Sequence, residues 1–152
     1  MSWTYNGHEF NQGNVGSSFG FVYCIHNLVD KKRYIGKKFF TKAGYKQVKG
    51  KRKKVRKPSD WEKYWGSNNT LINDVKKHGE DKFIREILYI CSNRSDCAYL
   101  ELKEQIDRRV LEREDYYNDY IYVRVAGRNI RFLTESGHQY VSNKDEESIN
   151  KK

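Results

Sequence analysis

Two short hydrophobic runs near the start of the chain predict a β-hairpin. Residues 20–26 read Gly-Phe-Val-Tyr-Cys-Ile-His, residues 27–32 are turn formers and charges, and residues 33–36 return as a second short run. Two such runs around a polar turn are typical of antiparallel strands. The preceding residues are rich in Gly, Asn and Ser, so an irregular arm is expected over residues 1–18.

The segment after the predicted hairpin lacks a clear period. Residues 42–57 are rich in Gly and Lys, and they predict a loop or an irregular helix that becomes ordered on a ligand. Ser59 and Glu62, three positions apart, match the capping-box pattern at the start of a helix. A short helix or turn is therefore expected here, with Trp61 and Trp65 pointing inward.

A helix, a strand and a longer helix are predicted farther along the chain. Residues 69–78 have an apolar face and end before Gly79, which favours a helix stop, and residues 83–90 predict a strand of the same sheet. The second helix is expected to begin after Asn93 or Ser95 and to end near residue 113. Its expected core stripe has a spacing of four and consists of Ala98, Leu102, Ile106 and Val110.

Together these elements predict one α/β domain with a small mixed or antiparallel three-stranded sheet flanked by helices. At 152 residues the chain suits a single hydrophobic core. Residues 115–125 are aromatic and β-rich, and residues 130–133 are expected as another strand. The expected division is the arm over 1–18, a domain over 19–133 and a polar, flexible tail over 134–152.

The positive charge of the chain is concentrated in one segment. The net charge is +10, yet residues 31–59 contain 14 of the 30 Lys and Arg and no Asp or Glu. The remaining 16 cations face 20 acidic residues, a net charge of −4. A localised basic segment indicates a polyanionic partner, because its cations release the counterions condensed on phosphates. The alternatives are a nuclear-import signal or a nonspecific polybasic loop.

The cellular location can be inferred from the cysteines, the histidines and the hydropathy of the chain. The three Cys and four His have neither the number nor the spacing typical of a disulfide framework or a zinc site. No run approaches the roughly 20 apolar residues of a membrane span, and the N-terminus lacks an apolar signal core. These observations predict a reduced, cytoplasmic location and no membrane partner.

Several short motifs, taken in order, resemble the GIY-YIG nuclease family. Phe21-Val22-Tyr23 and Tyr34-Ile35-Gly36 are similar to the paired tripeptides that name the family, and their tyrosines are eleven positions apart. Later matches resemble phage-type and homing-endonuclease members, and they are Trp61-x-x-Tyr64-x-Gly66-Ser67, Lys77-His78-Gly79, Phe83 and Tyr117-Asn118. The similarity covers roughly residues 20–118, and it implies a metal-dependent endonuclease that hydrolyses DNA.

The resemblance also implies a catalytic site. Tyr23 would activate or orient the attacking water, Tyr34 would position that water or the scissile phosphate, and Glu101 would hold a Mg²⁺ or Mn²⁺ ion. A divalent metal on a carboxylate stabilises the phosphoryl and leaving oxygens. An ordinary Tyr has a pKa of about 10, so a base role needs nearby cations that lower this pKa. Lys37 and Lys38 could supply them. The alternative for the two tyrosines is a cross-strand pair that only stabilises the hairpin.

Helical phase favours Glu101 over its neighbour Glu104 as the metal ligand. Around the expected stripe centred on Leu102, Glu101 lies about 100° from the centre and Glu104 roughly 160° from it. Glu104 is therefore expected to face solvent. The alternative is that both are ordinary surface glutamates of a charged helix.

One feature of the family is missing from the chain. The family carries an arginine some ten residues after the second tyrosine, where this chain has Ala43-Gly44-Tyr45. Lys37, Arg52 or Arg56 would then supply the cation that faces the phosphate, although lysine lacks the bidentate fork of arginine.

Two further residues are candidates for the site. Tyr64 is expected where some members of the family carry a second polar catalytic group. Asn118 resembles the late asparagine of the family, and a simple turn residue is the alternative there.

The basic segment is expected to follow the phosphates of a DNA substrate. Such contacts set affinity and register but carry no sequence information directly. The substrate can be a duplex, a branched structure or a specific site, and the protein can act alone, as a homodimer on DNA or with a partner. Rival hypotheses are a catalytically inactive nucleic-acid-binding protein of the same fold, and an interaction protein such as a nuclease inhibitor or a ribosome-associated basic domain. The expected DNA-binding residues are Lys38, Lys49, Lys51, Lys53, Lys54, Arg56 and Lys57.

Overall fold

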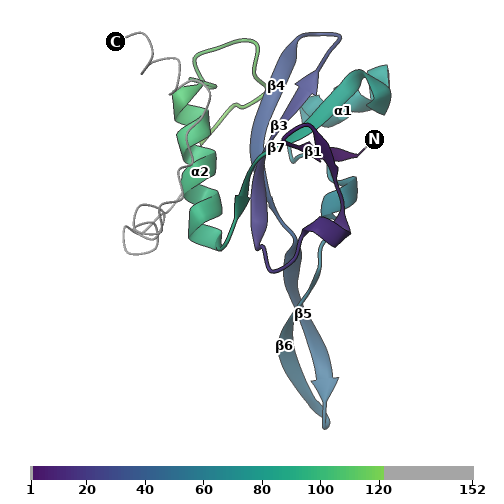
Figure 1. The fold of residues 1–152 in the computed structure, drawn as a ribbon. Coiled ribbons are helices and arrows are strands. Elements are labelled where there is room, and N and C mark those ends of the chain that lie inside the picture. Colours follow the sequence, from purple (N-terminus) through teal and green to yellow (C-terminus); the bar gives the residue numbers. More distant parts are fainter. Residues whose placement is uncertain (1, 122–152) are drawn as a thin grey trace.

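A five-stranded mixed sheet lies between two layers of helix, and a separate two-stranded ribbon extends from one end (Figure 1). The structure is a computed structural model, and it describes residues 2–121. The order of strands in the sheet is β2-β1-β7-β3-β4, and the ribbon consists of β5 and β6. Their bounds are β1 Trp3–Tyr5, β2 His8–Phe10, β3 Gly20–Asn27, β4 Lys32–Phe39, β5 Thr41–Val48, β6 Lys51–Pro58 and β7 Phe83–Cys91.

The centre of the sheet confirms the predicted hairpin and its third strand. β3 pairs antiparallel with β4 on one side and with β7 on the other. Alternate residues of β3 enter two separate cores, because successive side chains of a strand point to opposite faces. Phe21, Tyr23 and Ile25 pack under the α1 side of the sheet, whereas Val22 and Cys24 pack under the α2 side. The expected α/β class with a mixed sheet is therefore confirmed.

The N-terminal residues add two strands to the expected three. β1 pairs antiparallel with β2 and parallel with β7, so the irregular arm predicted over residues 1–18 is wrong for this segment. The strands are only three residues long, which gives no readable period in the sequence. Burial explains why they form. Trp3 is 1% exposed and its indole nitrogen donates to the carbonyl of Trp61.

The basic segment forms the β5–β6 hairpin, and not the predicted loop or irregular helix. The two strands pair over their whole length from Thr41 with Pro58 to Val48 with Lys51. The turn between them places Lys49 at φ 50° and Gly50 at φ 76°. Two successive residues with positive φ are typical of the type I′ turn, whose twist matches that of the strands.

The first helix agrees with its prediction. α1 spans Asn69–His78, it buries Leu71 and Val75, and it ends at Gly79 with φ 92°.

The capping box predicted at Ser59 and Glu62 does not form. The hydroxyl of Ser59 donates instead to the carbonyl of Phe39 at 2.6 Å, and the one-turn helix η2 (Trp61–Lys63) has no side-chain cap.

The second helix corrects the prediction in its length and in its inner face. α2 spans Arg94–Asp107 and so ends before residue 113. Ile106 is 59% exposed, whereas Glu104 is 3% exposed. The expectation that Glu104 faces solvent is therefore wrong, because its carboxylate accepts from the hydroxyl of Tyr89 at 2.5 Å and pairs with Arg108 at 2.8 Å. These partners offset the cost of burying the charge.

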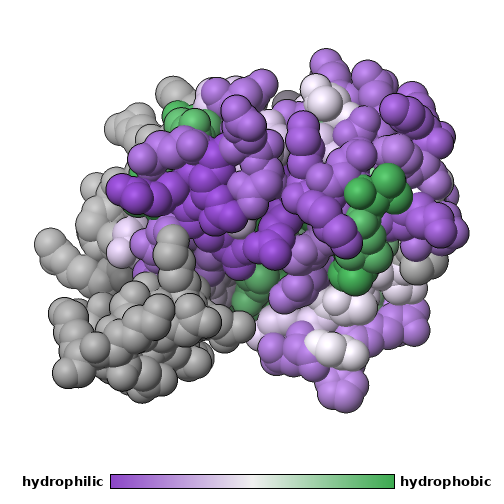
Figure 2. Space-filling model, turned by 90° about the horizontal axis from the view of Figure 1, so that it is seen from above, coloured by the Kyte–Doolittle hydropathy of each residue, from purple (hydrophilic) through white to green (hydrophobic). Residues whose placement is uncertain are grey.

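The end of the described chain returns to the sheet beside β4. Tyr116 forms an isolated parallel bridge with Arg33, and the expected strand over 115–125 is not formed in its described part. The strand expected over 130–133 and the tail over 134–152 lie outside the described residues. Within residues 2–121, neither helix is long and apolar enough to span a membrane. Seen from the end opposite the ribbon, the surface is largely hydrophilic with small separate apolar patches (Figure 2).

Candidate active site

A cavity of about 760 Å³ lies along β4, at the edge of the sheet. Tyr23 and Tyr34 reach it from the α1 side of the sheet, and Glu101 reaches it from α2 on the other side. The base of the β5–β6 ribbon closes one end through Thr41 and Arg56. The structure therefore brings the two motif tyrosines and the predicted metal ligand to one cleft.

Tyr23 lies opposite a bulge in β7 and is held by close packing. The pairing of β3 with β7 shifts register between Val22, opposite Tyr89, and Tyr23, opposite Ile87, so the extra residue is Leu88 of β7. Such β-bulges are frequent next to active sites. The Tyr23 ring is 1% exposed and packs edge-on against Trp3, with centroids 5.1 Å apart.

Burial keeps the hydroxyl of Tyr23 protonated. It raises the pKa of Tyr23 well above the ordinary value, and the nearby Tyr64, Tyr34 and Glu101 raise it further. A neutral hydroxyl can orient a water molecule by hydrogen bonding. It cannot remove a proton at neutral pH unless cations approach when the substrate binds.

The downstream motif surrounds the two tyrosines. Tyr64 packs edge-on against Tyr23 with centroids 6.2 Å apart, and the hydroxyls of Tyr34 and Ser67 lie 3.2 Å apart. A Cβ on Gly66 would lie 3.2 Å from the ring of Tyr34, and φ of Gly66 is +86°. The matches at 64, 66 and 67 thus share one task, which is to hold the tyrosine rings.

Arg85 in β7 supports the segment of residues 64–67 that holds the tyrosine rings. No sequence motif singled it out. Its guanidinium donates to the carbonyl of Tyr64 at 2.8 Å and lies over the rings of Trp3 and Trp65. Burial lowers the pKa of Arg85 to about 10, so it stays charged at neutral pH. The signal was the alternation of β7, in which Phe83, Arg85 and Ile87 share the buried face.

Glu101 lies in the cleft beside Lys37. Its side chain is 13% exposed, and its Oε1 accepts from the Lys37 ammonium at 3.1 Å. Burial raises the pKa of Glu101, and the charge of Lys37 partly opposes that rise. A hard divalent cation such as Mg²⁺ or Mn²⁺ takes one or two carboxylates plus water and phosphate oxygens. A single recessed carboxylate in a cleft with open volume fits that donor set.

Asn118 has a structural role beside the site. Its side-chain oxygen accepts from the backbone N–H of Ile35 at 3.0 Å, and its side-chain nitrogen donates to the Ile35 carbonyl at 2.8 Å. The amide therefore pairs with β4 as a neighbouring strand would. This fixes the strand that carries Tyr34, Gly36 and Lys37, and makes Asn118 a positioning residue.

Two of the three expected cations, Lys37 and Arg56, line the cleft, and Arg52 does not. Arg52 stacks on Tyr45 at 3.9 Å, far out on β6, and does not line the cavity. Arg56 does line it, and its guanidinium donates to the carbonyl of Thr41 at 2.8 Å. Arg94 at the start of α2 lines it as well, 4.9 Å from the ring centre of Phe39. No sequence motif relates Arg94 to the tyrosines, so its place in the cleft could not be predicted.

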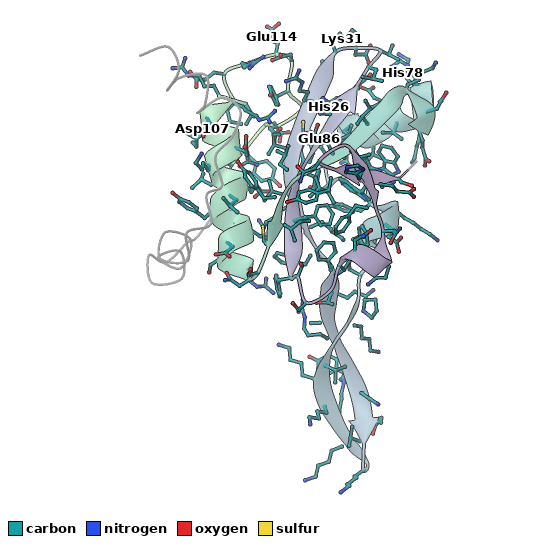
Figure 3. The ribbon with its side chains drawn as sticks, in the orientation of Figure 1. His26, Lys31, His78, Glu86, Asp107 and Glu114 are labelled. Atoms are coloured by element: carbon teal, nitrogen blue, oxygen red, sulfur yellow. The ribbon has the colours of Figure 1, made fainter. Side chains whose placement is uncertain are left out.

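The expected DNA-binding residues fall into two places. Lys38 lines the cleft, pairs with Asp60 at 2.8 Å and lies 4.1 Å from the ring centre of Tyr64. The others belong to the ribbon, where the lysines are exposed (Figure 3). These are Lys49, Lys51, Lys53, Lys54, Arg56 and Lys57.

His78 belongs to a second polar cluster, away from the cleft. Ligand atoms of His78, Asp30 and Asp74 lie within 4.8 Å of one another. His78 pairs with Asp30 at 2.9 Å, and the hydroxyl of Tyr117 donates to Asp74 at 2.6 Å. The His78–Asp30 pair ties the end of α1 to the β3–β4 turn, which Lys31 marks in Figure 3, and the Tyr117–Asp74 bond ties α1 to residue 117.

The fold and the cleft define a nuclease domain of the GIY-YIG type, with its two tyrosines facing one carboxylate across an edge strand. The model of the SegE GIY-YIG family, described as putative endonuclease segE, GIY-YIG domain, matches residues 3–121. The chain therefore belongs to the GIY-YIG family, and this membership implies nuclease activity on a nucleic acid. No curated protein and no solved structure matches the chain.

Proposed function

We propose that the chain is a divalent-metal-dependent endonuclease that hydrolyses phosphodiester bonds of duplex DNA. The observation that carries this proposal is the meeting of Tyr23, Tyr34 and Glu101 in one cleft bordered by cations. Mg²⁺ or Mn²⁺ held by Glu101 would supply Lewis-acid stabilisation of the phosphoryl and leaving oxygens.

The side chains of the cleft have separate tasks in this proposal. The neutral hydroxyl of Tyr23 accepts a hydrogen bond from the attacking water and orients it. The hydroxyl of Tyr34, next to that of Ser67, holds the scissile phosphate. Lys37 keeps Glu101 ionised, because its ammonium favours the carboxylate form.

Arg56 is proposed as the cation that faces the phosphate in place of the missing family arginine. Its Nε donates to the Thr41 hydroxyl at 3.1 Å, and one terminal nitrogen donates to the Thr41 carbonyl. This anchoring holds the guanidinium at the cleft. A planar guanidinium is suited to bidentate contact with phosphate.

A plasmid assay tests the proposal. Supercoiled DNA is incubated with the full chain in Mg²⁺, in EDTA, and in Mg²⁺ with Glu101→Ala; Glu112→Ala, at an exposed glutamate outside the cleft, is the matched control. Nicking or linearisation by the wild type and Glu112→Ala in Mg²⁺ alone supports it. Intact plasmid with every protein would overturn the proposal and leave the alternative that the missing arginine motivates, a catalytically inactive protein of the same fold.

A further inference from the structure

The β5–β6 ribbon stands apart from the domain with both of its faces uncovered (Figures 1 and 3). Tyr45 is 51% exposed and Val48 is 39% exposed. An isolated two-stranded ribbon is marginally stable in water, so this one depends on its base. There the Ser59 N–H donates to the Phe40 carbonyl, and Arg56 donates to Thr41.

The two faces of the ribbon differ in their chemistry. Residues paired across an antiparallel ribbon share a face, and neighbours along a strand alternate between faces. Lysine, glycine and valine make up one face from residue 42 outward, with pairs Lys42–Lys57, Gly44–Val55, Lys46–Lys53 and Val48–Lys51. The other face carries all of the ribbon's arginines, with pairs Ala43–Arg56, Tyr45–Lys54 and Gln47–Arg52.

The face with the arginines continues from the cleft. Ala43 and Arg56 line the cavity, and from the opposite face only Lys42 reaches it. The next pairs outward add Tyr45 and Arg52, whose ring centre and guanidinium lie 3.9 Å apart. In the major groove arginine contacts guanine bidentately and glutamine contacts adenine bidentately, and lysine also occurs on guanine. Lysine is a flexible point charge suited to phosphates.

The charge of the ribbon identifies its partner. Residues 41–58 contain nine Lys and Arg and no Asp or Glu. Such a density is matched by the phosphates of a duplex, which carries about one negative charge per 1.7 Å of axis. An eight-residue strand is about 27 Å long, enough to span several base pairs.

We infer that the β5–β6 ribbon enters the major groove of B-form DNA, with Tyr45, Gln47 and Arg52 toward the base edges and the opposite lysines reaching the flanking phosphates. This rests on the proposed DNA nuclease function and adds a sequence-reading element to it. The major groove is about 12 Å wide and admits a two-stranded ribbon, whereas the minor groove is about 6 Å wide. The deep, narrow major groove of A-form RNA excludes such a ribbon. The bases that are read would then lie beside the cut.

Adjacent residues of β6 provide a matched test. Arg52→Gln and Lys51→Gln each remove one exposed charge, one from each face. The full chain and both variants are used in EDTA to select bound sequences from a randomised duplex pool. Affinity for one selected duplex is then measured beside the same duplex with 7-deazaguanine, which lacks the N7 acceptor in the major groove, and beside duplex RNA of that sequence.

The expected result separates the two variants. Wild type and Lys51→Gln enrich the same motif, and Arg52→Gln loses preference at one or more positions of it. Deazaguanine at such a position weakens wild-type binding by about tenfold and leaves Arg52→Gln unaffected. Duplex RNA binds at least tenfold more weakly than the selected duplex.

Three results would overturn the inference. They are the absence of an enriched motif, an equal effect of Arg52→Gln and Lys51→Gln on the motif, and equal affinity for duplex RNA. Arg52 and Lys51 are both exposed, and unfolding curves of the variants check that the domain is intact. If plasmid cleavage persists while the motif is absent, groove reading fails and the nuclease proposal stands.

Discussion

Tyr23 and Gly36 face each other across the β3–β4 pair, and the ring of Tyr23 occupies the space that a side chain at position 36 would need. A Cβ there would lie 2.6 Å from Cζ of Tyr23 and 3.0 Å from Cε1 of Tyr34, and it would also meet the Tyr23 hydroxyl. Because Gly36 has negative φ, its role is close approach and not unusual backbone geometry. The glycine of the second tripeptide therefore makes room for the tyrosine of the first.

Gly36→Ala should displace the ring of Tyr23 from the cleft. Overpacking of this kind costs roughly 1–3 kcal/mol, so denaturant unfolding should show a loss of that size. The cleavage rate per folded molecule should also fall, because the Tyr23 hydroxyl moves away from the water that it orients. Gly50→Ala is the control for stability alone, since φ of Gly50 is positive but nothing lies within 4 Å of the added Cβ. Normal cleavage by Gly36→Ala would contradict the packing argument.

Tyr23→Phe should abolish cleavage while DNA affinity stays near the wild-type value. The ring and its contacts with Trp3 and Tyr64 remain, and only one hydroxyl disappears. A loss of roughly 10²-fold or more in the single-turnover rate is expected for a group that handles the attacking water. Binding is measured by anisotropy in EDTA. Equal losses of binding and cleavage would mean that Tyr23 is only structural.

Lys37→Met should move the acid limb of the pH–rate profile to higher pH. Burial raises the pKa of Glu101, and the Lys37 ammonium opposes this rise. Without the ammonium the pKa of Glu101 rises further, so the carboxylate is protonated and activity is lost at a higher pH than in the wild type. Single-turnover rates across pH at one fixed Mg²⁺ concentration below saturation measure the shift, because protons and Mg²⁺ compete for the carboxylate. Lys103→Met, which removes a cation of α2 paired with Asp107, should leave the limb in place.

Asn118→Ala should destabilise the domain and reduce cleavage indirectly. Both hydrogen bonds of Asn118 to the Ile35 backbone are lost: the N–H loses its acceptor, and the carbonyl keeps only the longer contact from Gln105 at 3.4 Å. The expected cost is roughly 2–4 kcal/mol in denaturant unfolding. Activity per folded molecule should fall, while the pH profile keeps its shape because no titrating group is removed. A change of the pH profile with unchanged stability would instead indicate a direct role.

Arg56→Gln should lower the cleavage rate at saturating DNA by about tenfold or more, as expected for a phosphate-facing donor. Lys57→Gln is the matched control, since the neighbouring Lys57 lies on the opposite face, where its stem packs over Gly44. It removes the same charge and should weaken binding without changing the rate at saturation. Equal rates for the two variants would show that Arg56 contributes only to affinity.

Elements with a clear apolar face could be predicted from the sequence. β3 is apolar and buried along nearly its whole length, β7 buries alternate residues and α1 buries helically spaced ones, and their expected bounds are close to those observed. The ribbon gave no such signal, because Tyr45 and Val48 are exposed and no face is buried. The strands before residue 11 were too short to show a period, and they are recognised only by the pairing of β1 with β7.

In helix α2 the apolar pattern predicted the wrong inner face, because polar residues are buried there. The predicted stripe followed aliphatic residues, yet the inner face takes Glu104 and Gln105, while Ile106 is exposed. Glu104 is buried because Tyr89 and Arg108 satisfy it, and these partners lie on other turns and strands. Glu101 follows from the family resemblance and does line the cleft, although the helical phase used to prefer it over Glu104 was wrong. Motif order located the tyrosines, whereas Arg85 and Arg94 depend on contacts between distant segments.

Residues 115–118 are hydrogen-bonded along the outer edge of β4, and this limits self-association through that edge. β4 is an outer strand of the sheet, and an open outer strand offers its backbone to another molecule for strand addition and fibril growth. Here the backbone N–H of Arg33 donates to the Asp115 carbonyl, and the Arg33 carbonyl accepts from the Tyr117 N–H. The backbone N–H and carbonyl of Ile35 are bonded to the side chain of Asn118. A strand from a second copy finds these groups already engaged. Strand addition at residues 33–35 of β4 is therefore blocked, while residues 37–39 of the same strand remain at the cleft that receives the substrate.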